Sequence, residues 1–129
     1  YNQKKAYEFS KKKHIIILCG HYEGFDERIR SFCDEEVSIG DFILTGGEIP
    51  AMAITDSVVR LIDGVITSTS LETESFNDNL LDYPVYTKPR EYRGMGVPLV
   101  LLNGNHKLIN EFREEERKRI TKEYRDDLL

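Results

Sequence analysis

Two glycine-bearing bends are the part of this sequence whose residue types could do chemistry. One spans residues 20–24, and the other runs from Gly40 through an apolar stretch to Gly46 and Gly47. Glycine removes the side chain that would keep a flat ligand away from main-chain amides and carbonyls. Both bends therefore favour a small planar molecule bound by backbone hydrogen bonds, and an ordinary strand-to-helix turn is an equally good explanation of the second.

Four side chains near the bends could add to such a site. Tyr22 could stack on a planar group or pack at a rim, and Glu23 could face a cation or an amino group. Arg60 follows Asp56 by four residues, so it either forms a surface ion pair or presents its guanidinium to an anionic or carbonyl oxygen. His21 has no second ligand or base beside it in the sequence, which predicts a surface or capping residue.

Neither a metal site nor a disulfide is indicated. Asp34, Glu35 and Glu36 are consecutive, and consecutive residues of an extended chain point to opposite faces rather than toward one ion. Cys19 and Cys33 have no metal-ligand spacing and form no disulfide framework. Both are expected to be reduced thiols.

The composition is that of a soluble globular domain. The chain has 129 residues, of which 40% are hydrophobic, enough for a core. Its longest apolar run, residues 15–19, is far too short to cross a bilayer, and no signal-peptide pattern precedes it, so we expect a cytoplasmic protein. The first residue is not methionine, and the pattern there is typical of the middle of a helix. We therefore expect a piece of a longer protein.

The net charge of −5 conceals a gradient along the chain. Residues 1–30 hold seven basic and four acidic groups, residues 31–85 hold one and eleven, and residues 86–129 hold ten and eight. The net charge argues against a general nucleic-acid clamp, and a polyanion, if one binds, is expected to contact the two ends of the sequence.

The apolar spacing predicts the elements that position the bends. They are a helix capped by Asn2, a buried strand at 14–19, a short helix at 25–32, a strand at 37–39 and a helix at 50–64. An uninterrupted β-branched run implies that helices cover both faces of the strand, which is typical of a parallel sheet.

The second half of the chain is less regular. Residues 67–79 are polar without periodicity and are predicted to be a mobile linker that includes Glu72, Glu74 and Phe76. An irregular basic passage and a short apolar run at 99–102 follow. The last element is a surface helix at 107–124, capped by Asn105 and stabilised by two expected ion pairs, Glu114–Lys118 and Glu115–Arg119.

Several motifs in a fixed order carry a resemblance to a known family. The long ones are LCGHYEGFDER at 18–28 and DEEVSIGDFILTGGE at 34–48; LLDYP at 80–84, YTKP at 86–89, VP at 97–98 and GNH at 104–106 continue the series. Together they cover nearly the whole chain, which resembles the bacterial tRNA (guanine-N1)-methyltransferases.

The resemblance implies the SPOUT fold, an α/β domain with a parallel sheet and a deep trefoil knot, followed by a small helical carboxy-terminal domain. Residues 1–66 would then be the knotted cofactor-binding part, incomplete at its amino end, 67–79 the flexible linker, and 80–129 part of the tRNA-contacting domain. The family's amino-terminal part, with a strand and loop that help to hold the cofactor, is missing.

The resemblance also implies an activity. The family are homodimers that transfer a methyl group from S-adenosylmethionine to N1 of the guanosine immediately 3′ of the anticodon, tRNA position 37. The linker of one subunit completes the active site of the other. The implied cofactor residues are Gly20, Tyr22, Glu23, Gly24, Ile39, Gly40, Asp41, Phe42, Ile43, Leu44, Gly46 and Gly47. The implied tRNA contacts are Lys88, Asn105, His106 and Arg113. The sequence leaves open whether Mg2+ is required.

The reaction itself indicates which catalytic groups are needed. Guanine N1 carries a proton, so methylation there requires a general base, and charge that builds on O6 requires a cation or donor. By the resemblance, Arg60 serves O6, and Glu74 stands where the family has its aspartate base. Glutamate is longer by one methylene, and a misplacement of about 1 Å can cost about a hundredfold in rate.

The chain departs from the family at three other positions. Val85 and Lys88 replace a histidine and an arginine, and Phe112 replaces a tryptophan. Lysine keeps the charge but loses the planar bidentate grip on phosphate. A non-catalytic cofactor- or RNA-binding remnant of the enzyme is therefore the alternative function.

Overall fold

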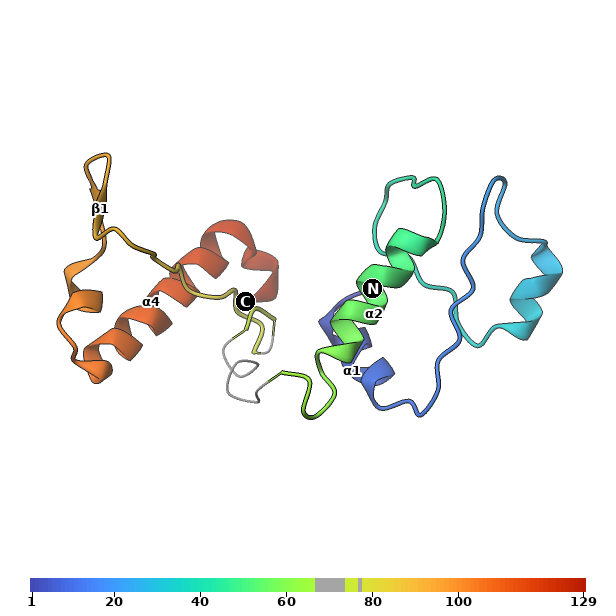
Figure 1. The fold of residues 1–129 in the computed structure, drawn as a ribbon, viewed down its shortest axis with the longest axis horizontal. Helices are drawn as coiled ribbons and strands as arrows, with labels where there is room; N and C mark the ends of the chain where they lie inside the picture. The colour runs from blue at the N-terminus through green and yellow to red at the C-terminus, as the bar shows by residue number, and fades with distance from the viewer. Residues whose placement is uncertain (67–73, 77) are drawn as a thin grey trace. The chain divides into compact units, whose positions relative to one another are not determined.

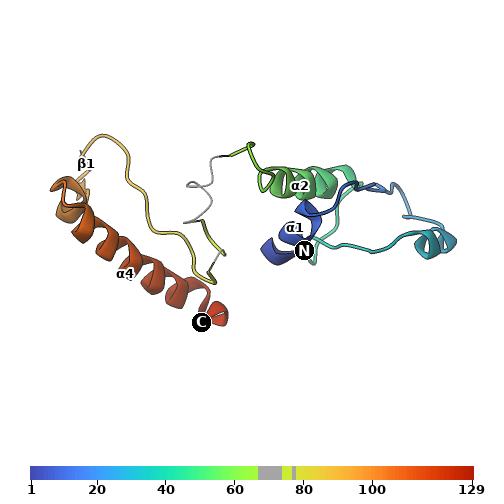
Figure 2. The same cartoon turned by 90° about the horizontal axis from the view of Figure 1, so that it is seen from below.

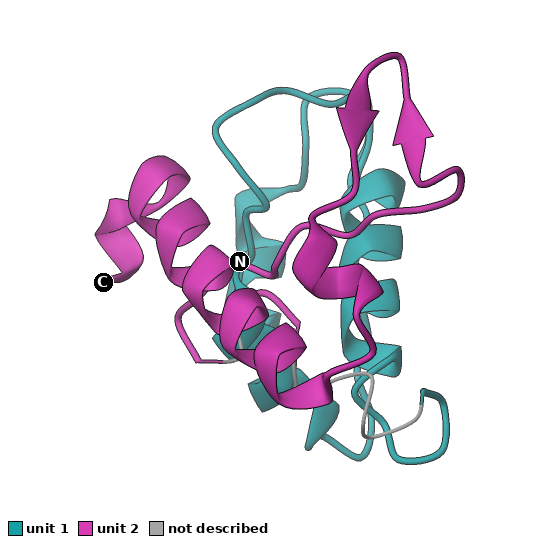
Figure 3. Ribbon diagram, turned by 90° about the vertical axis from the view of Figure 1, so that its left-hand side faces the viewer, with its two compact units in different colours: residues 1–71 teal, residues 72–129 magenta. Residues whose placement is uncertain are grey.

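The computed structural model describes residues 1–66, 74–76 and 78–129. They form two compact units, one within residues 1–71 and the other within residues 72–129, coloured separately in Figure 3. Helices and one small sheet make up the regular structure (Figure 1).

The first unit is built on two α-helices, α1 (Gln3–Ser10) and α2 (Glu48–Val59), which lie side by side in both views of the ribbon (Figures 1 and 2). As predicted, Asn2 caps α1: its side-chain oxygen accepts a hydrogen bond of 3.0 Å from the amide of Lys5. The buried centre between the helices is small. It contains Ala6, Ile54 and Val58, with Phe9, Val37, Ile39 and Leu61 packed against it.

The helix predicted at residues 50–64 is α2, which begins two residues earlier and ends at Val59. Pro50 lies in the first turn, where its missing N–H has no intrahelical partner to lose. The short helix predicted at 25–32 is the 3₁₀-helix η1 (Glu27–Phe32), and the carboxylate of Asp26 caps it through the amide of Arg28 at 2.9 Å.

The prediction of a buried strand at residues 14–19 is wrong for this chain. The segment runs without a β-ladder, and Ile16 and Leu18 are 77% and 52% exposed. Residues 37–39 form no strand either, although Val37 and Ile39 pack against the core as side chains. A strand needs a neighbouring strand whose carbonyl groups accept hydrogen bonds from its N–H groups. Within residues 1–66, no segment pairs with these two in a ladder.

The only sheet in the described parts of the chain lies in the second unit. It is an antiparallel pair, β1 (Glu91–Tyr92) and β2 (Met95–Gly96), in which Glu91 faces Gly96 and Tyr92 faces Met95. The chain thus combines helices with a small sheet, and the expected parallel sheet is absent from the residues described.

The longest element of the second unit is the helix α4 (His106–Tyr124). The 3₁₀-helix η2 (Leu99–Leu102) precedes it in the sequence, η3 (Asp126–Leu128) follows it, and both contact it. The predicted cap is confirmed, since the side-chain oxygen of Asn105 accepts from the amides of Lys107 and Leu108 at 3.2 and 3.3 Å. Among the described residues, no helix has both the length and the apolarity to cross a membrane.

The two ion pairs predicted on this helix are not the ones that form. Arg119 donates from Nε and Nη2 to the two carboxylate oxygens of Glu116, at 2.9 and 2.8 Å, and from Nη1 to Glu123 at 2.8 Å. Glu114 pairs with Arg117 at 3.2 Å. Two parallel N–H donors to one carboxylate make the Arg119–Glu116 contact stronger than the expected single pair.

Replacing Asn105 by alanine is expected to lower the free energy of unfolding by about 1 kcal/mol, because the first-turn amides of α4 lose their acceptor. Asn105→Asp should keep most of the stability, since aspartate is an equally good cap. Urea unfolding followed by far-UV circular dichroism measures both. Asn110→Ala, an exposed position inside α4, is the matched control and should cause no loss; a loss as large as that of Asn105→Ala would contradict the cap.

Candidate functional site

The two glycine-bearing bends meet at one point. The amide of Gly47 donates a 3.0 Å hydrogen bond to the carbonyl oxygen of Gly20, and His21 forms a β-bridge with Gly46. A Cβ at position 47 would lie 2.8 Å from the Cα of Cys19, so only glycine allows this close approach. The structure therefore brings together Gly20, Gly46 and Gly47 from the implied cofactor set.

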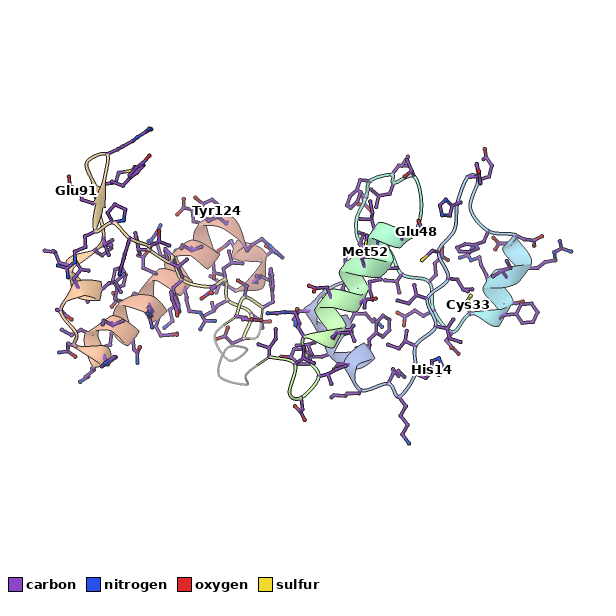
Figure 4. The ribbon with its side chains drawn as sticks, viewed as in Figure 1. His14, Cys33, Glu48, Met52, Glu91 and Tyr124 are labelled. Atoms are coloured by element: carbon purple, nitrogen blue, oxygen red, sulfur yellow. The ribbon has the colours of Figure 1, made fainter. Side chains whose placement is uncertain are left out.

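A side-chain contact between a histidine and a glutamate links the first bend to the start of α2. The Nε2 atom of His21 pairs with Oε1 of Glu48, the first residue of α2. Glu48 is labelled at the start of this helix in Figure 4. The imidazole holds the pKa of the Glu48 carboxyl below its ordinary value, and a hydrogen bond from the backbone of Glu48 acts in the same direction. An anionic Glu48 also suits the positive end of the helix dipole. His21 is an exposed surface residue, one of the two roles that the sequence predicted, and its side chain does not cap α2.

The remaining implied cofactor residues are spread over two loops. In the first bend, Tyr22 and Gly24 have left-handed φ values of 56° and 100°, and Tyr22 is fully exposed. Residues 40–46 form an arch beside the amino-terminal end of α2 (Figure 1). Phe42 and Ile43 are exposed in that arch, the latter to 99%. Residues 40–46 form no strand, and within the described residues of the first unit these two side chains are left uncovered.

The two expected catalytic residues belong to different units. Arg60 follows α2 directly, and its amide donates to the carbonyl of Asp56 at 3.2 Å. The residue is half-buried and stands at the negative end of the helix dipole. Glu74 is in the second unit, next to Ser75, whose hydroxyl accepts a 2.8 Å hydrogen bond from the amide of Asp82. Neither unit by itself holds both residues.

A hollow of about 410 Å³ lies on the second unit, between the passage at residues 83–90 and the start of α4. Lys88 and Arg113 from the implied tRNA contacts both line it, and so do Tyr83 and Arg90. The guanidinium of Arg113 stacks 4.6 Å from the Tyr83 ring centroid, and its buried Nε has no hydrogen-bond partner among the described residues. Positive charge beside aromatic rings suits the phosphates and bases of RNA.

The other two implied tRNA contacts lie outside the lining of this hollow. Asn105 uses its side-chain oxygen as the helix cap, and His106 is the exposed first residue of α4. Sequence reasoning did not select Tyr83 or Arg90 as site residues. The available signal was the cluster of basic residues just after two tyrosines, in the passage that the motifs mark.

Two of the three carboxylates at residues 34–36 form ion pairs. Glu35 pairs with Lys5 at 2.8 Å and Glu36 with Arg30 at 2.6 Å, and the hydrogen bond to Glu35 raises the pKa of Lys5. Within the described ranges, no three histidine, cysteine, aspartate or glutamate side chains gather as metal ligands would.

Comparison with known proteins places the chain in a family. The family model described as tRNA (Guanine-1)-methyltransferase TrmD matches residues 1–129. A relative from Ureaplasma urealyticum serovar 10, named tRNA (guanine-N(1)-)-methyltransferase, is 60% identical over 129 residues, which cover 99% of this chain and 57% of the relative. Proteins of the same name from Clostridioides difficile (strain 630) and Thermotoga maritima are 58% and 56% identical, with 99% and 100% of this chain and 56% and 53% of the relatives covered.

The chain spans about half the length of the curated relatives that it matches. The match nevertheless leaves no residue of the chain outside the family model, and the glycine junction and the GNH helix cap both fall within it. The chain belongs to the tRNA (guanine-1)-methyltransferase family.

Proposed function

We propose that the full-length protein transfers a methyl group from S-adenosylmethionine to N1 of the guanosine immediately 3′ of the anticodon, tRNA position 37. Family membership carries the proposal, because the matching model describes this class of enzyme and the relatives bear its name. Because the chain spans about half of those relatives, activity, substrate and partners are proposed for the whole protein.

The full-length protein is a cytoplasmic homodimer with the SPOUT fold, its parallel sheet and its trefoil knot. Residues 1–66 belong to the knotted cofactor-binding domain, 67–79 are the linker, and 80–129 belong to the tRNA-contacting domain. The exposed apolar side chains of the first unit support this reading. Large apolar side chains such as Ile16, Leu18 and Ile43 are usually buried in a complete domain, but here they are exposed. Further strands of the family fold would cover them.

S-adenosylmethionine is held by the two bends around Gly20 and Gly47. The main chain of the first bend fits such a ligand, because a Cβ at Gly24 would meet no atom within 4 Å and Tyr22 is fully exposed. When bound, the cofactor supplies an electrophilic methyl group.

Glu74 takes the proton from guanine N1, and Arg60 stabilises the charge that develops on O6. In the homodimer the linker of one subunit brings Glu74 to the Arg60 of the other, which agrees with the location of the two residues in separate units. The position of Arg60 at the carboxyl end of α2 supports its role, since the hydrogen bond from its amide to the carbonyl of Asp56 fixes the backbone of the residue.

Lys88, Arg90 and Arg113 bind the tRNA backbone at the hollow of the second unit, with Tyr83 available for stacking. Asn105 and His106 contribute at the start of α4. The concentration of basic residues in 86–129 supports this surface as the tRNA-contacting one.

Incubation of the full-length protein with labelled S-adenosylmethionine and a tRNA carrying G37 tests the proposal. We expect label in 1-methylguanosine after nuclease digestion and chromatography, and none when position 37 is adenosine. A folded protein that binds S-adenosylmethionine or tRNA but forms no 1-methylguanosine would contradict the proposal and favour the non-catalytic remnant.

A further inference from the structure

We infer that Arg117 is a positioning residue for the proposed methyl transfer. It fixes the Glu74 segment, defined as residues 74–76 and 78–82, against α4 and so sets where the Glu74 carboxylate stands. The inference rests on the proposed function, in which Glu74 is the base.

Arg117 is a buried charged residue of the second unit, with 3% of its surface exposed. Its Nη2 donates to Oδ1 of Asp78 at 2.5 Å, and its Nε donates to the carbonyl oxygen of Leu81 at 3.3 Å. A third bond, from Nη1 to Glu114 at 3.2 Å, stays within α4. Two of the three acceptors therefore come from the Glu74 segment, some forty residues earlier in the sequence.

Thr121, one helical turn further along α4, makes a second attachment. It is fully buried, its Oγ1 accepts from the amide of Leu81 at 2.8 Å, and the same hydroxyl donates to the carbonyl of Arg117 at 2.7 Å. Leu81 is thus held at both its N–H and its C=O. A backbone fixed at both polar groups has little freedom to shift along the helix.

The attachment continues from Leu81 toward Glu74. The amide of Asp82 donates to the Ser75 hydroxyl at 2.8 Å, and the amide of Phe76 donates to the carbonyl of Leu80 at 2.8 Å. The guanidinium of Arg125 lies 5.7 Å from the Phe76 ring centroid. These contacts fold the segment back on itself. Ser75 is therefore fixed, and the residue directly before it is Glu74, the proposed base.

Three properties make Arg117 the controlling member of this set. Its planar guanidinium bonds both acceptors of the Glu74 segment, Asp78 and Leu81, in a fixed geometry that lysine cannot reproduce. A charge that is removed from water requires its partners, so the pair with Asp78 persists whenever the helix is packed. The hydrogen bond from Arg117 lowers the pKa of the Asp78 carboxyl, so the contact favours the ionised form of that partner.

The test compares Arg117→Lys and Asp78→Asn with the parent in the full-length protein. Turnover is expressed per S-adenosylmethionine site counted by equilibrium titration, so that unfolded molecules are not counted. We expect kcat to fall by at least about tenfold in each variant, because a base displaced by a fraction of 1 Å is a poorer base. The KM for S-adenosylmethionine should stay within about twofold of the parent value.

Two further measurements separate positioning from simple stabilisation. The double variant should lose little more than either single variant, because the two residues act through one contact. The acidic limb of the kcat–pH profile should persist in Arg117→Lys, since the base is displaced but present, whereas Glu74→Gln should remove it. Arg119→Lys, at an exposed arginine of the same helix whose partners Glu116 and Glu123 lie on α4 itself, is the matched control and should keep the parental kcat.

Unchanged kcat per site in Arg117→Lys, or an equal loss in Arg119→Lys, would overturn the inference. Amide hydrogen exchange gives a result that does not depend on catalysis: the amides of Leu81 and Asp82 should exchange at least about tenfold faster in Arg117→Lys. If the parent transfers no methyl group, the proposed function fails. If these amides exchange at the parental rate, the attachment by Arg117 fails.

Discussion

Replacing Glu74 by glutamine in the full-length protein is expected to lower kcat for tRNA methylation by about 10²–10⁴-fold, the usual contribution of a general base. Glutamine keeps the size and the hydrogen-bonding oxygen of the side chain but cannot take the proton of guanine N1. The measurement is single-turnover methyl transfer to a tRNA with G37. The affinity for S-adenosylmethionine should change little, since the exchange removes a proton acceptor and no backbone contact.

Two companion variants make this result specific. Glu74→Asp introduces the shorter carboxylate that the resemblance implies at this position, and its kcat should be at least that of the parent if the longer side chain lowers the rate. Glu115→Gln removes an exposed carboxylate from the middle of α4 and should leave kcat unchanged. Activity retained in Glu74→Gln, with the protein folded, would remove Glu74 as the base.

Local signals in the sequence predicted the helices well. Asn2 and Asn105 both cap a helix as expected, because a cap depends on residues within three positions of it. The predicted start of a helix at residue 50 was close for the same reason, since Pro50 lies in the first turn of α2. These contacts are complete within one element, so they form whatever surrounds it.

The predicted strands depended on partners, and there the prediction went wrong. The run at residues 14–19 has the composition of a strand buried on both faces, but burial and a β-ladder both need other segments. The residues described in the first unit supply none, and Ile16 stays 77% exposed. The apolar pattern therefore predicts that the segment would form a strand if it were buried and paired. Residues 1–66 alone provide neither the cover nor the pairing strand.

The contacts of the second unit were hidden from sequence for a different reason. Arg117 and Asp78 meet across 39 positions, and no spacing rule connects residues so far apart. A weak signal was available: Arg117 falls on the helical stripe of Ile109 and Ile120, where an apolar residue would be usual. A charged residue on such a stripe indicates a buried polar contact, but not its partner.

Replacing Gly47 by alanine is expected to have the largest effect on cofactor binding. The new Cβ would lie 2.8 Å from the Cα of Cys19 and 3.1 Å from the amide nitrogen of Gly20, which are backbone atoms that cannot turn aside. The two bends must separate, which breaks the 3.0 Å hydrogen bond between Gly47 and Gly20. Overpacking of this kind costs about 1–3 kcal/mol of unfolding free energy.

Because Gly20 and Gly47 are both proposed to line the cofactor site, the same separation should weaken S-adenosylmethionine binding by at least about tenfold, equivalent to about 1.4 kcal/mol. Isothermal titration of the full-length protein measures the affinity, and urea unfolding measures the stability. Gly96→Ala is the matched control: a Cβ there meets no atom within 4 Å, so stability should stay within about 0.5 kcal/mol of the parent and affinity should not change. Parental affinity in Gly47→Ala would show that the cofactor binds away from this junction, whereas lost stability with parental affinity would leave the junction a purely structural contact.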